Sequence, residues 1–435
     1  MSNFNDQSDY RTKCLDKWMK MPGKLSVANI PNADLRANLA ILLENQANYK
    51  EGVLNEADTG TTNFGSNGGD GARFQPISLA LVRRAYYEHF AHKVVGFQAM
   101  TGPVGLAYAW RKIYDIPGMP GSSAFSGGSD QYEMAFRALN EYSGYTGSNA
   151  QSAYAASAVT NQWDISNSAT FGKFGEGAAT SAAELWKVGT TMPATRAFMD
   201  KVAIEAKTRK LAASFSLEAA QDLKSMHNID IERELLETLS VEIPAERDRE
   251  IIGRMLQAST NIANGGTAPI ILSADTTDGR WSQEKFANIT NAIVKLSHDI
   301  ATKTMRGAGN FVIVSPRVAT ALQASGPQFT AITVDVNASS TVAEVGKINN
   351  TITVYRDNLA PIDYALVGYK GPGISDTGIV VSDYITGLTN RAVRPDDFGV
   401  NIGVMSRYAI TDSLLGSGRY YRTMKILNLD KVLGL

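Results

Sequence analysis

The sequence predicts an α+β protein, and three stretches support that prediction. A long helical pattern runs from about Ile231 to Ala258. A strand-like pattern with strict alternation runs from Leu106 to Ile113, and residues 270–388 alternate between helical and strand patterns. Helices that alternate with buried strands are typical of an α/β domain, whereas the ribbon and the long helix need a separate packing unit. We therefore expect more than one domain in the 435 residues.

The long helix has an interrupted apolar face. Asn228 and Asp230 are suitable N-cap residues just before it. Apolar residues recur every fourth position and then resume two turns later: Ile231, Leu235, Leu239 and Ile243, then Ile251, Ile252, Met255 and Leu256. The charged run 246–250 between them predicts a solvated or interface-facing middle. Pro244 has no N–H to donate, so we expect a bend there.

The stretch 106–113 predicts a two-faced β-ribbon. Large side chains alternate with mostly smaller ones: Leu106, Tyr108, Trp110 and Lys112 against Ala107, Ala109, Arg111 and Ile113. A two-stranded ribbon is only marginally stable alone, so it needs a surface to lean on. We expect a neighbouring subunit to supply that surface and assign Tyr108, Trp110 and Arg111 to the contact. The alternative is that the ribbon packs on residues 117–192 of its own chain.

Residues 270–388 contain a regular order of elements. Apolar positions from Phe286 to Ile300 predict an amphipathic helix that ends near Gly307. Phe311–Val314 predicts a buried strand, and Pro316 follows as a helix start. Further on, Val400, Ile402 and Val404 alternate as in a strand with one buried face, and Tyr420 to Leu435 would form the last strand and tail.

The N-terminal residues 1–56 form a segment of their own. Leucines at helical spacing predict a helix capped by Asn32 or Asp34: Leu35, Leu39, Leu42 and Leu43. The simplest interpretation is an amphipathic arm packed on the body. The glycine-rich run 60–71 follows; it has no Gly-Lys-Ser/Thr, which favours a flexible arm over a phosphate loop. Pro76 then opens a predicted helix, Ile77–Lys93.

Composition and motifs argue against nucleic-acid binding, metal binding, membrane spanning and catalysis. The 42 basic and 43 acidic residues nearly cancel, which gives no sign of a nucleic-acid surface. Cys14 is the single cysteine, and Glu88, His89 and His92 are better explained by structure than by a metal. No apolar run reaches the roughly 20 residues of a membrane span, and no signal peptide is visible. The glycines at 307 and 309 precede their strand, which excludes a dinucleotide loop. With no hydrolase motif either, we expect no enzyme activity, cofactor or metal site.

Several motifs carry a family resemblance. They include Ile204–Leu211 with its continuation to Leu223, Leu81–Ala85, Gln98–Gly105, Gly309–Phe311 and Val367–Pro372. In this order they resemble the major capsid protein of T-even-like contractile-tailed bacteriophages. The resemblance covers most of the chain and is weakest between residues 118 and 192.

The resemblance implies the tailed-phage major capsid fold, with an N-terminal arm, an extended β-hairpin loop, a peripheral domain with a long spine helix, and an axial α/β domain. It implies that residues 204–223 hold the return strand of the extended loop, which we extend over Val202–Phe215. The expected divisions are 1–56 (propeptide), 57–93 (arm and first helix), 94–215 (extended loop with an insertion at about 118–192), 216–264 (peripheral domain), 265–390 (axial domain) and 391–435 (return to the peripheral domain).

The resemblance also implies proteolytic processing. Leu54, Asn55, Glu56 and Ala57 resemble the family's junction, where an assembly protease cuts after Glu when Leu or Ile stands two residues earlier. The same short motif occurs at Glu44, Glu141 and Glu237. Exposed and mobile backbone is cut most readily, and a helix interior is not. We therefore expect the cut at the Glu56–Ala57 bond, which also removes Cys14.

By resemblance, this chain self-assembles into hexamers that join their shell neighbours in an icosahedral head. Its partners would be the vertex protein, the scaffold, the assembly protease and packaged DNA that is enclosed without sequence-specific binding, with no membrane. Its location would be the virion, after assembly in the host cytoplasm. The paralogous pentameric vertex protein is an alternative, although Met100–Pro103 favours the major subunit. Outside phages, a cellular nanocompartment shell shares the fold, but the arm and its junction argue against it. An α/β enzyme is the candidate from a different functional class.

Overall fold

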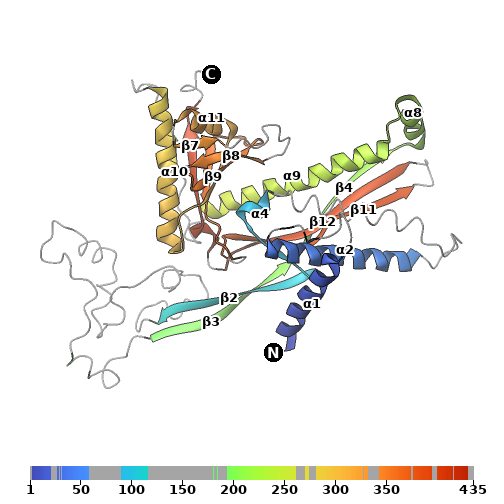
Figure 1. The fold of residues 1–435 in the computed structure, drawn as a ribbon, viewed down its shortest axis with the longest axis horizontal. Helices are drawn as coiled ribbons and strands as arrows, with labels where there is room; N and C mark the ends of the chain where they lie inside the picture. Colours follow the sequence, from blue (N-terminus) through green and yellow to red (C-terminus); the bar gives the residue numbers. More distant parts are fainter. Residues whose placement is uncertain are drawn as a thin grey trace.

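The chain folds around one long helix, α9 (Ile231–Thr260), which contacts both of the larger β-sheets (Figure 1). The structure is a computed structural model. It describes residues 2–20, 27–28, 30, 32–57, 90–115, 180, 184, 194–260, 270–273, 281–326, 328–331, 342–373, 376–393, 399–414 and 416–429. Along α9, Leu239 and Ile243 are buried in its first half, and Ile251, Ile252 and Met255 in its second. The predicted apolar face is confirmed.

The start of α9 follows from local chemistry. Asp230 Oδ1 accepts the backbone N–H of Glu232 at 3.2 Å, as an N-cap should. Asn228 has another role, because it is left-handed (φ 54°) and ends the preceding helix, α8 (Leu217–His227). The helix continues without a break through Pro244.

A four-stranded sheet lies along the first half of α9. Its strand order is β1-β11-β12-β4, where β1 and β11 are parallel and the other neighbours antiparallel. Leu239 and Ile243 of α9 pack against Val404 of β12, with Leu211 and Ala213 of β4 beside them. The strands are β1 (Gly96–Ala99), β4 (Lys207–Phe215), β11 (Ile379–Val393) and β12 (Val400–Asp412). The alternation predicted at Val400, Ile402 and Val404 is confirmed, since all three are buried.

A seven-stranded sheet lies at the other end of α9, with the order β5-β13-β10-β6-β9-β8-β7. In β6, Phe311 and Ile313 face the cluster that includes α9, whereas Val312 and Val314 face α10 and α11. Helices therefore cover both faces (Figure 1). The elements are β5 (Ile270–Ser273), α10 (Ser282–Thr304), β6 (Phe311–Val314), α11 (Pro316–Ala324), β7 (Phe329–Ala331), β8 (Val342–Ile348), β9 (Ile352–Asp357), β10 (Tyr364–Gly368), the short 3₁₀ helix η6 (Ser417–Arg419) and β13 (Tyr421–Leu427).

The division expected between residues 390 and 391 is wrong in two places. Strand β11 begins at Ile379 and belongs to the four-stranded sheet, although the expected axial domain extended to residue 390. Strand β13 pairs with β10 and β5 in the seven-stranded sheet, although the expected return segment placed it in the peripheral domain. The chain therefore crosses between the two sheets three times, once more than expected.

The predicted ribbon is present, but its return strand is not the expected one. β2 (Val104–Asp115) pairs antiparallel with β3 (Ala194–Glu205) along its whole length. The expected return strand, Val202–Phe215, straddles a break at Ala206, where the backbone N–H bonds to the Pro103 carbonyl at 2.9 Å. After this break β4 joins the four-stranded sheet instead. The ribbon projects from the body, with β2 and β3 side by side (Figure 1).

The N-terminal segment packs on the body as two helices, α1 (Ser2–Met19) and α2 (Ala33–Ala57). Asn32 Oδ1 accepts the Asp34 N–H at 3.0 Å, which confirms one of the two predicted caps. The predicted helix Ile77–Lys93 is described only where it overlaps α4 (Ala91–Val94), and the glycine-rich run and nearly all of 118–192 lie outside the described residues. None of the helices described is long and apolar enough to span a membrane.

Candidate functional site

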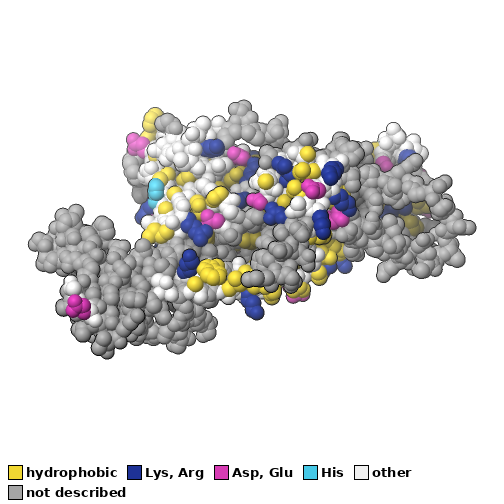
Figure 2. All heavy atoms as spheres, turned by 60° about the horizontal axis from the view of Figure 1, so that its bottom comes forward, with side chains coloured by type: hydrophobic (Ala, Val, Ile, Leu, Met, Phe, Trp, Pro, Cys, Tyr) yellow, Lys and Arg dark blue, Asp and Glu magenta, His cyan; other side chains and the backbone are white. Residues whose placement is uncertain are grey.

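The ribbon presents one exposed apolar face. Cross-strand partners share a face, and Tyr108 pairs with Lys201 as Trp110 pairs with Met199. Tyr108 is 52% exposed and Trp110 62% exposed. The exposed apolar residues of this face are Val104, Leu106, Tyr108, Trp110 and Met199. Figure 2 turns this side of the molecule forward and shows hydrophobic side chains at the surface between basic ones. Exposed apolar stripes are typical of interaction sites.

Arg111 does not belong to that face. Its side chain is 13% exposed and lies 3.5 Å from an oxygen of Asp200, which is on the opposite side of the ribbon from Trp110. The structure therefore keeps Tyr108 and Trp110 together as predicted and separates Arg111 from them. Arg111 pairs instead with Asp200 on the opposite face of the ribbon.

The root of the ribbon is fixed to α9 by a charged cluster. Arg209 of β4 lies 2.8 Å from Glu246 and 2.6 Å from Glu250, and the Tyr408 hydroxyl donates to Glu250 at 2.6 Å. Burial alone would raise the pKa of Glu250, but the hydrogen bonds from Tyr408 and Arg209 hold it below its ordinary value. The hydrogen bond to Glu250 raises the pKa of Arg209. This cluster borders a 460 Å³ pocket between the ribbon root and α9.

The charged middle of α9 is solvated only in part: Glu246 is exposed, as expected, but the solvated middle is wrong for the two charges that follow it. Arg247 and Asp248 are buried, and Arg247 Nη2 lies 2.6 Å from Asp383 Oδ1 in β11. The Arg247 guanidinium also stacks near the rings of Phe97 and Tyr408, at 5.1 and 4.9 Å from their centroids. A charge run alone gives no sign of such pairing, because the partners are distant in sequence.

A second ion pair links α9 to the seven-stranded sheet. Arg249 Nη1 lies 2.5 Å from Asp357 Oδ2, and the same carboxylate accepts the Tyr364 hydroxyl at 2.7 Å. Asp357 is fully buried. Arg247 and Arg249 of α9 thus pair with different sheets, which fixes the helix relative to both.

The predicted processing junction lies at the end of a helix. Leu54, Asn55, Glu56 and Ala57 are the last residues of α2, so the helix extends one residue past the predicted cut. The similar motif at Glu44 lies inside the same helix, and its carboxylate accepts from Lys17 at 2.8 Å and Trp18 at 2.9 Å. The Glu44 side chain is 14% exposed. Of these two sites, only the one at the helix end can open by fraying.

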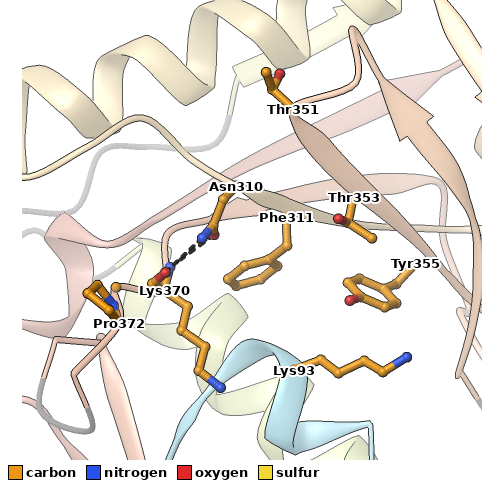
Figure 3. A pocket seen from close by; sticks show the side chains of 9 residues that line it. Lys93, Asn310, Phe311, Thr351, Thr353, Tyr355, Lys370 and Pro372 are labelled. Carbon is orange, nitrogen blue, oxygen red and sulfur yellow. Dashed lines mark hydrogen bonds between the residues drawn. The ribbon is translucent and has the colours of Figure 1, made fainter. Parts of the chain in front are cut away.

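A polar pocket of 340 Å³ lies where α4 meets the seven-stranded sheet. Figure 3 shows Lys370 reaching from one wall toward α4, where its ammonium donates to the His92 carbonyl. Lys93 pairs with Glu344 at 3.1 Å. Both lysines therefore have structural partners. The His92 ring lies 3.9 Å from that of Phe97, and the described residues hold no group of three metal-ligating side chains.

Comparison with known proteins identifies the family. A family model described as "Major capsid protein Gp23" matches residues 71–426. The chain is 28% identical over 480 residues to the major capsid protein of Enterobacteria phage T6, which covers 92% of this chain and 94% of that protein. It is 28% identical over 377 residues to that of Salmonella phage ViI, with 85% and 83% covered.

Other matches are more distant. The capsid vertex protein of Enterobacteria phage T4 is 24% identical over 250 residues, covering 52% of this chain and 56% of that protein. Among solved structures, the mature capsid of bacteriophage PhiM1 gives a TM-score of 0.43 at 11% identity, covering 79% of this chain and 88% of that one. The capsid of phage XM1 gives 0.39 at 10%, covering 77% and 89%.

The family match spans most of the chain, including both sheets, the ribbon and α9. The matched relatives are structural proteins. The chain therefore belongs to the Gp23 family of major capsid proteins and is a structural subunit of a tailed-phage head, not an enzyme.

Proposed function

We propose that this chain forms hexameric capsomers, in which the apolar face of each ribbon lies over a neighbouring copy. The observation that carries the proposal is the stripe Val104, Leu106, Tyr108, Trp110 and Met199, which is exposed in the single chain. A two-stranded ribbon with a large apolar face is not stable in water without a partner. Aromatic side chains such as Tyr108 and Trp110 are also the commonest anchors of protein interfaces.

The body offers a rigid platform for such contacts. α9 joins the four-stranded sheet through Arg247 and the seven-stranded sheet through Arg249. In this proposal α9 is the spine of the peripheral domain, and the seven-stranded sheet is the axial domain at the capsomer centre. Many modest contacts between copies then stabilise the shell together.

The remaining partners follow from the family. The proposal includes an internal scaffold and an assembly protease during assembly in the host cytoplasm, and the vertex protein at the corners of the finished head. The near balance of 42 basic and 43 acidic residues supports enclosure of DNA without sequence-specific binding.

The pentameric vertex protein is the second candidate. The vertex protein of phage T4 matches 52% of the chain, whereas major capsid proteins match up to 92%. The Met100–Pro103 sequence also favours the hexamer-forming subunit. Electron microscopy of the purified protein tests this directly: six-membered rings or closed shells are expected, and five-membered rings alone would favour the vertex role.

The proposal includes removal of residues 1–56 by hydrolysis of the Glu56–Ala57 bond. Water adds across the amide, which leaves a carboxylate on Glu56 and an amine on Ala57. The position of the bond at the end of α2 supports this cut over Glu44, whose carboxylate holds Lys17 and Trp18. It also supports it over Glu237, which lies within α9.

Sequencing the N-terminus of the subunit from infectious particles tests the cut. We expect Ala57 as the first residue, and we expect Glu56→Gln to give particles that keep the N-terminal segment. Glu44→Gln is the matched control and should leave the new N-terminus unchanged. Mature particles whose subunit begins at Met1 or Ser2 would contradict the proposal.

A further inference from the structure

The N-terminal segment is built into the core of the body. In α2, Leu39, Leu42 and Leu43 are almost completely buried. They belong to the same apolar cluster as Phe97 of β1, Val381 of β11 and residues of the second half of α9: Ile251, Ile252, Met255 and Ala258. Such apolar packing does not depend on chain continuity, because it is proportional to the area removed from water.

Two amide side chains, of which Asn38 is buried and Asn45 partly buried, add hydrogen bonds between α2 and the body. The Asn38 amide donates to the Phe97 carbonyl at 2.9 Å, and the Asn45 amide donates to the carbonyls of Met100 and Tyr384 at 2.8 and 3.2 Å. Phe97 lies in β1, the edge strand of the four-stranded sheet. An uncovered edge strand offers free backbone groups to any other chain. Helix α2 therefore covers both an apolar surface and a sheet edge.

Helix α1 packs on α2. Trp18 is buried against α2, and its indole N–H donates to Glu44 at 2.9 Å. Lys17 donates to the same carboxylate. The two helices form one unit, which the body holds through α2.

All of these contacts precede the junction. The contacts of the segment described above lie between Lys17 and Asn45, and the predicted cut follows Glu56. Hydrolysis at 56–57 leaves each of them in place. Loss of the segment would uncover the β1 edge and expose the apolar cluster to water, and the carbonyls of Phe97, Met100 and Tyr384 would exchange these donors for water.

We propose that the body contains a helix-binding surface, formed by β1 and β11, which retains residues 1–56 as a bound peptide after cleavage. Cutting and release are then separate steps. Release follows when β1 and β11 move or another surface replaces α2. The role of this retention in assembly rests on the proposed cleavage of the Glu56–Ala57 bond. The binding of residues 1–56 to this surface does not.

The test uses the full chain with a recognition sequence for a site-specific protease inserted within residues 65–71. The purified subunit is cut and run on a size-exclusion column in native buffer, with mass spectrometry of the peak. We expect the N-terminal fragment to co-elute with the body in equal amounts and to separate in denaturant. A fragment that leaves the body in native buffer would overturn the proposal.

The double variant Asn38→Ala/Asn45→Ala tests whether these two side chains hold the fragment on the body. We expect its fragment to dissociate at least about tenfold more readily, since buried carbonyls lose their donors. The single variants serve if the double variant does not fold. Lys13→Ala, exposed on α1, is the matched control and should retain the fragment as the wild type does. Retention unaffected by the asparagine substitutions would overturn the assigned surface. Because the engineered cut does not use Glu56, these results are independent of N-terminal sequencing of particles.

Discussion

Arg247 and Asp383 form an ion pair of 2.6 Å between the middle of α9 and strand β11, with side chains only 5% and 0% exposed. The pair lies where α9, β1 and β11 meet, since the Arg247 guanidinium also contacts the Phe97 ring of β1. A buried pair of this kind fixes the position of a helix on a sheet more than it adds net stability.

Removal of one partner should therefore be costly. Asp383→Asn leaves a buried guanidinium without its counter-charge, and we expect a loss of about 3–5 kcal/mol in the free energy of unfolding. Chemical denaturation of the unassembled subunit measures it. Asp34→Asn is the matched control, because its pair with Arg11 is 54% and 41% exposed and should contribute about 0–1 kcal/mol. Equal effects of the two substitutions would contradict the interpretation.

Pro244 lies inside α9, between the two buried stretches of the helix. Pro244→Ala restores a backbone donor, and helix propensity favours alanine by up to about 3 kcal/mol. We expect a more stable subunit and a straighter helix, with more shells of aberrant size. Thermal unfolding and electron microscopy report these two effects separately. Native size and yield in the variant would mean that the predicted bend has no part in shell curvature.

The ion pair of Glu250 with Arg209 predicts that the folding stability falls at acid pH. The folded-state pKa of Glu250 lies below its ordinary value of 4.5, so the ionised form stabilises the fold above that pH. The stabilisation is lost as pH falls through the depressed pKa. Glu250→Gln should cost about 1 kcal/mol at about pH 6, because the pair is partly exposed, and the difference should shrink at about pH 3.5. Glu246→Gln, at a more exposed acceptor of Arg209, should change less at both pH values.

The buried Lys370 predicts that the folding stability also changes at alkaline pH. Burial lowers its pKa from 10.5 to about 8 in the folded state. Between these values the unfolded chain binds more protons, so folding stability rises with pH. We expect Lys370→Met to remove up to about 3 kcal/mol of that rise. Unfolding at about pH 7 and about pH 10 measures it, and ionising tyrosines cancel in the comparison because both proteins contain them. Parallel pH profiles would contradict the assignment.

Elements with local patterns could be predicted from the sequence. The apolar period of α9, the alternation of the ribbon strand, the buried strand Phe311–Val314 and the helix after Ser315 all depend on neighbours within one or two turns. Caps were predictable for the same reason, although Asn228 ends α8 rather than starting α9.

Features that depend on distant partners could not be predicted. The charges at 247 and 248 are buried because Asp383 and the rings of Phe97 and Tyr408 surround that turn of α9. The break at Ala206 and the placement of β13 reflect pairing across the fold. The grip of Asn38 and Asn45 on β1 and β11 joins residues up to 339 positions apart and has no local signal.

Contact between neighbouring copies depends most on the exposed face of the ribbon, and Trp110→Ala tests that contact most directly. We expect the variant subunit to melt like the wild type, because Trp110 is exposed in the single chain. We expect capsomer formation, followed by sedimentation and electron microscopy, to weaken by about 2 kcal/mol or more if Trp110 is an interface anchor. Lys201→Ala, on the same face beside Tyr108, is the control and should change assembly little. A Trp110→Ala subunit that unfolds as a monomer yet assembles normally once folded would contradict the account and place Trp110 in an internal core.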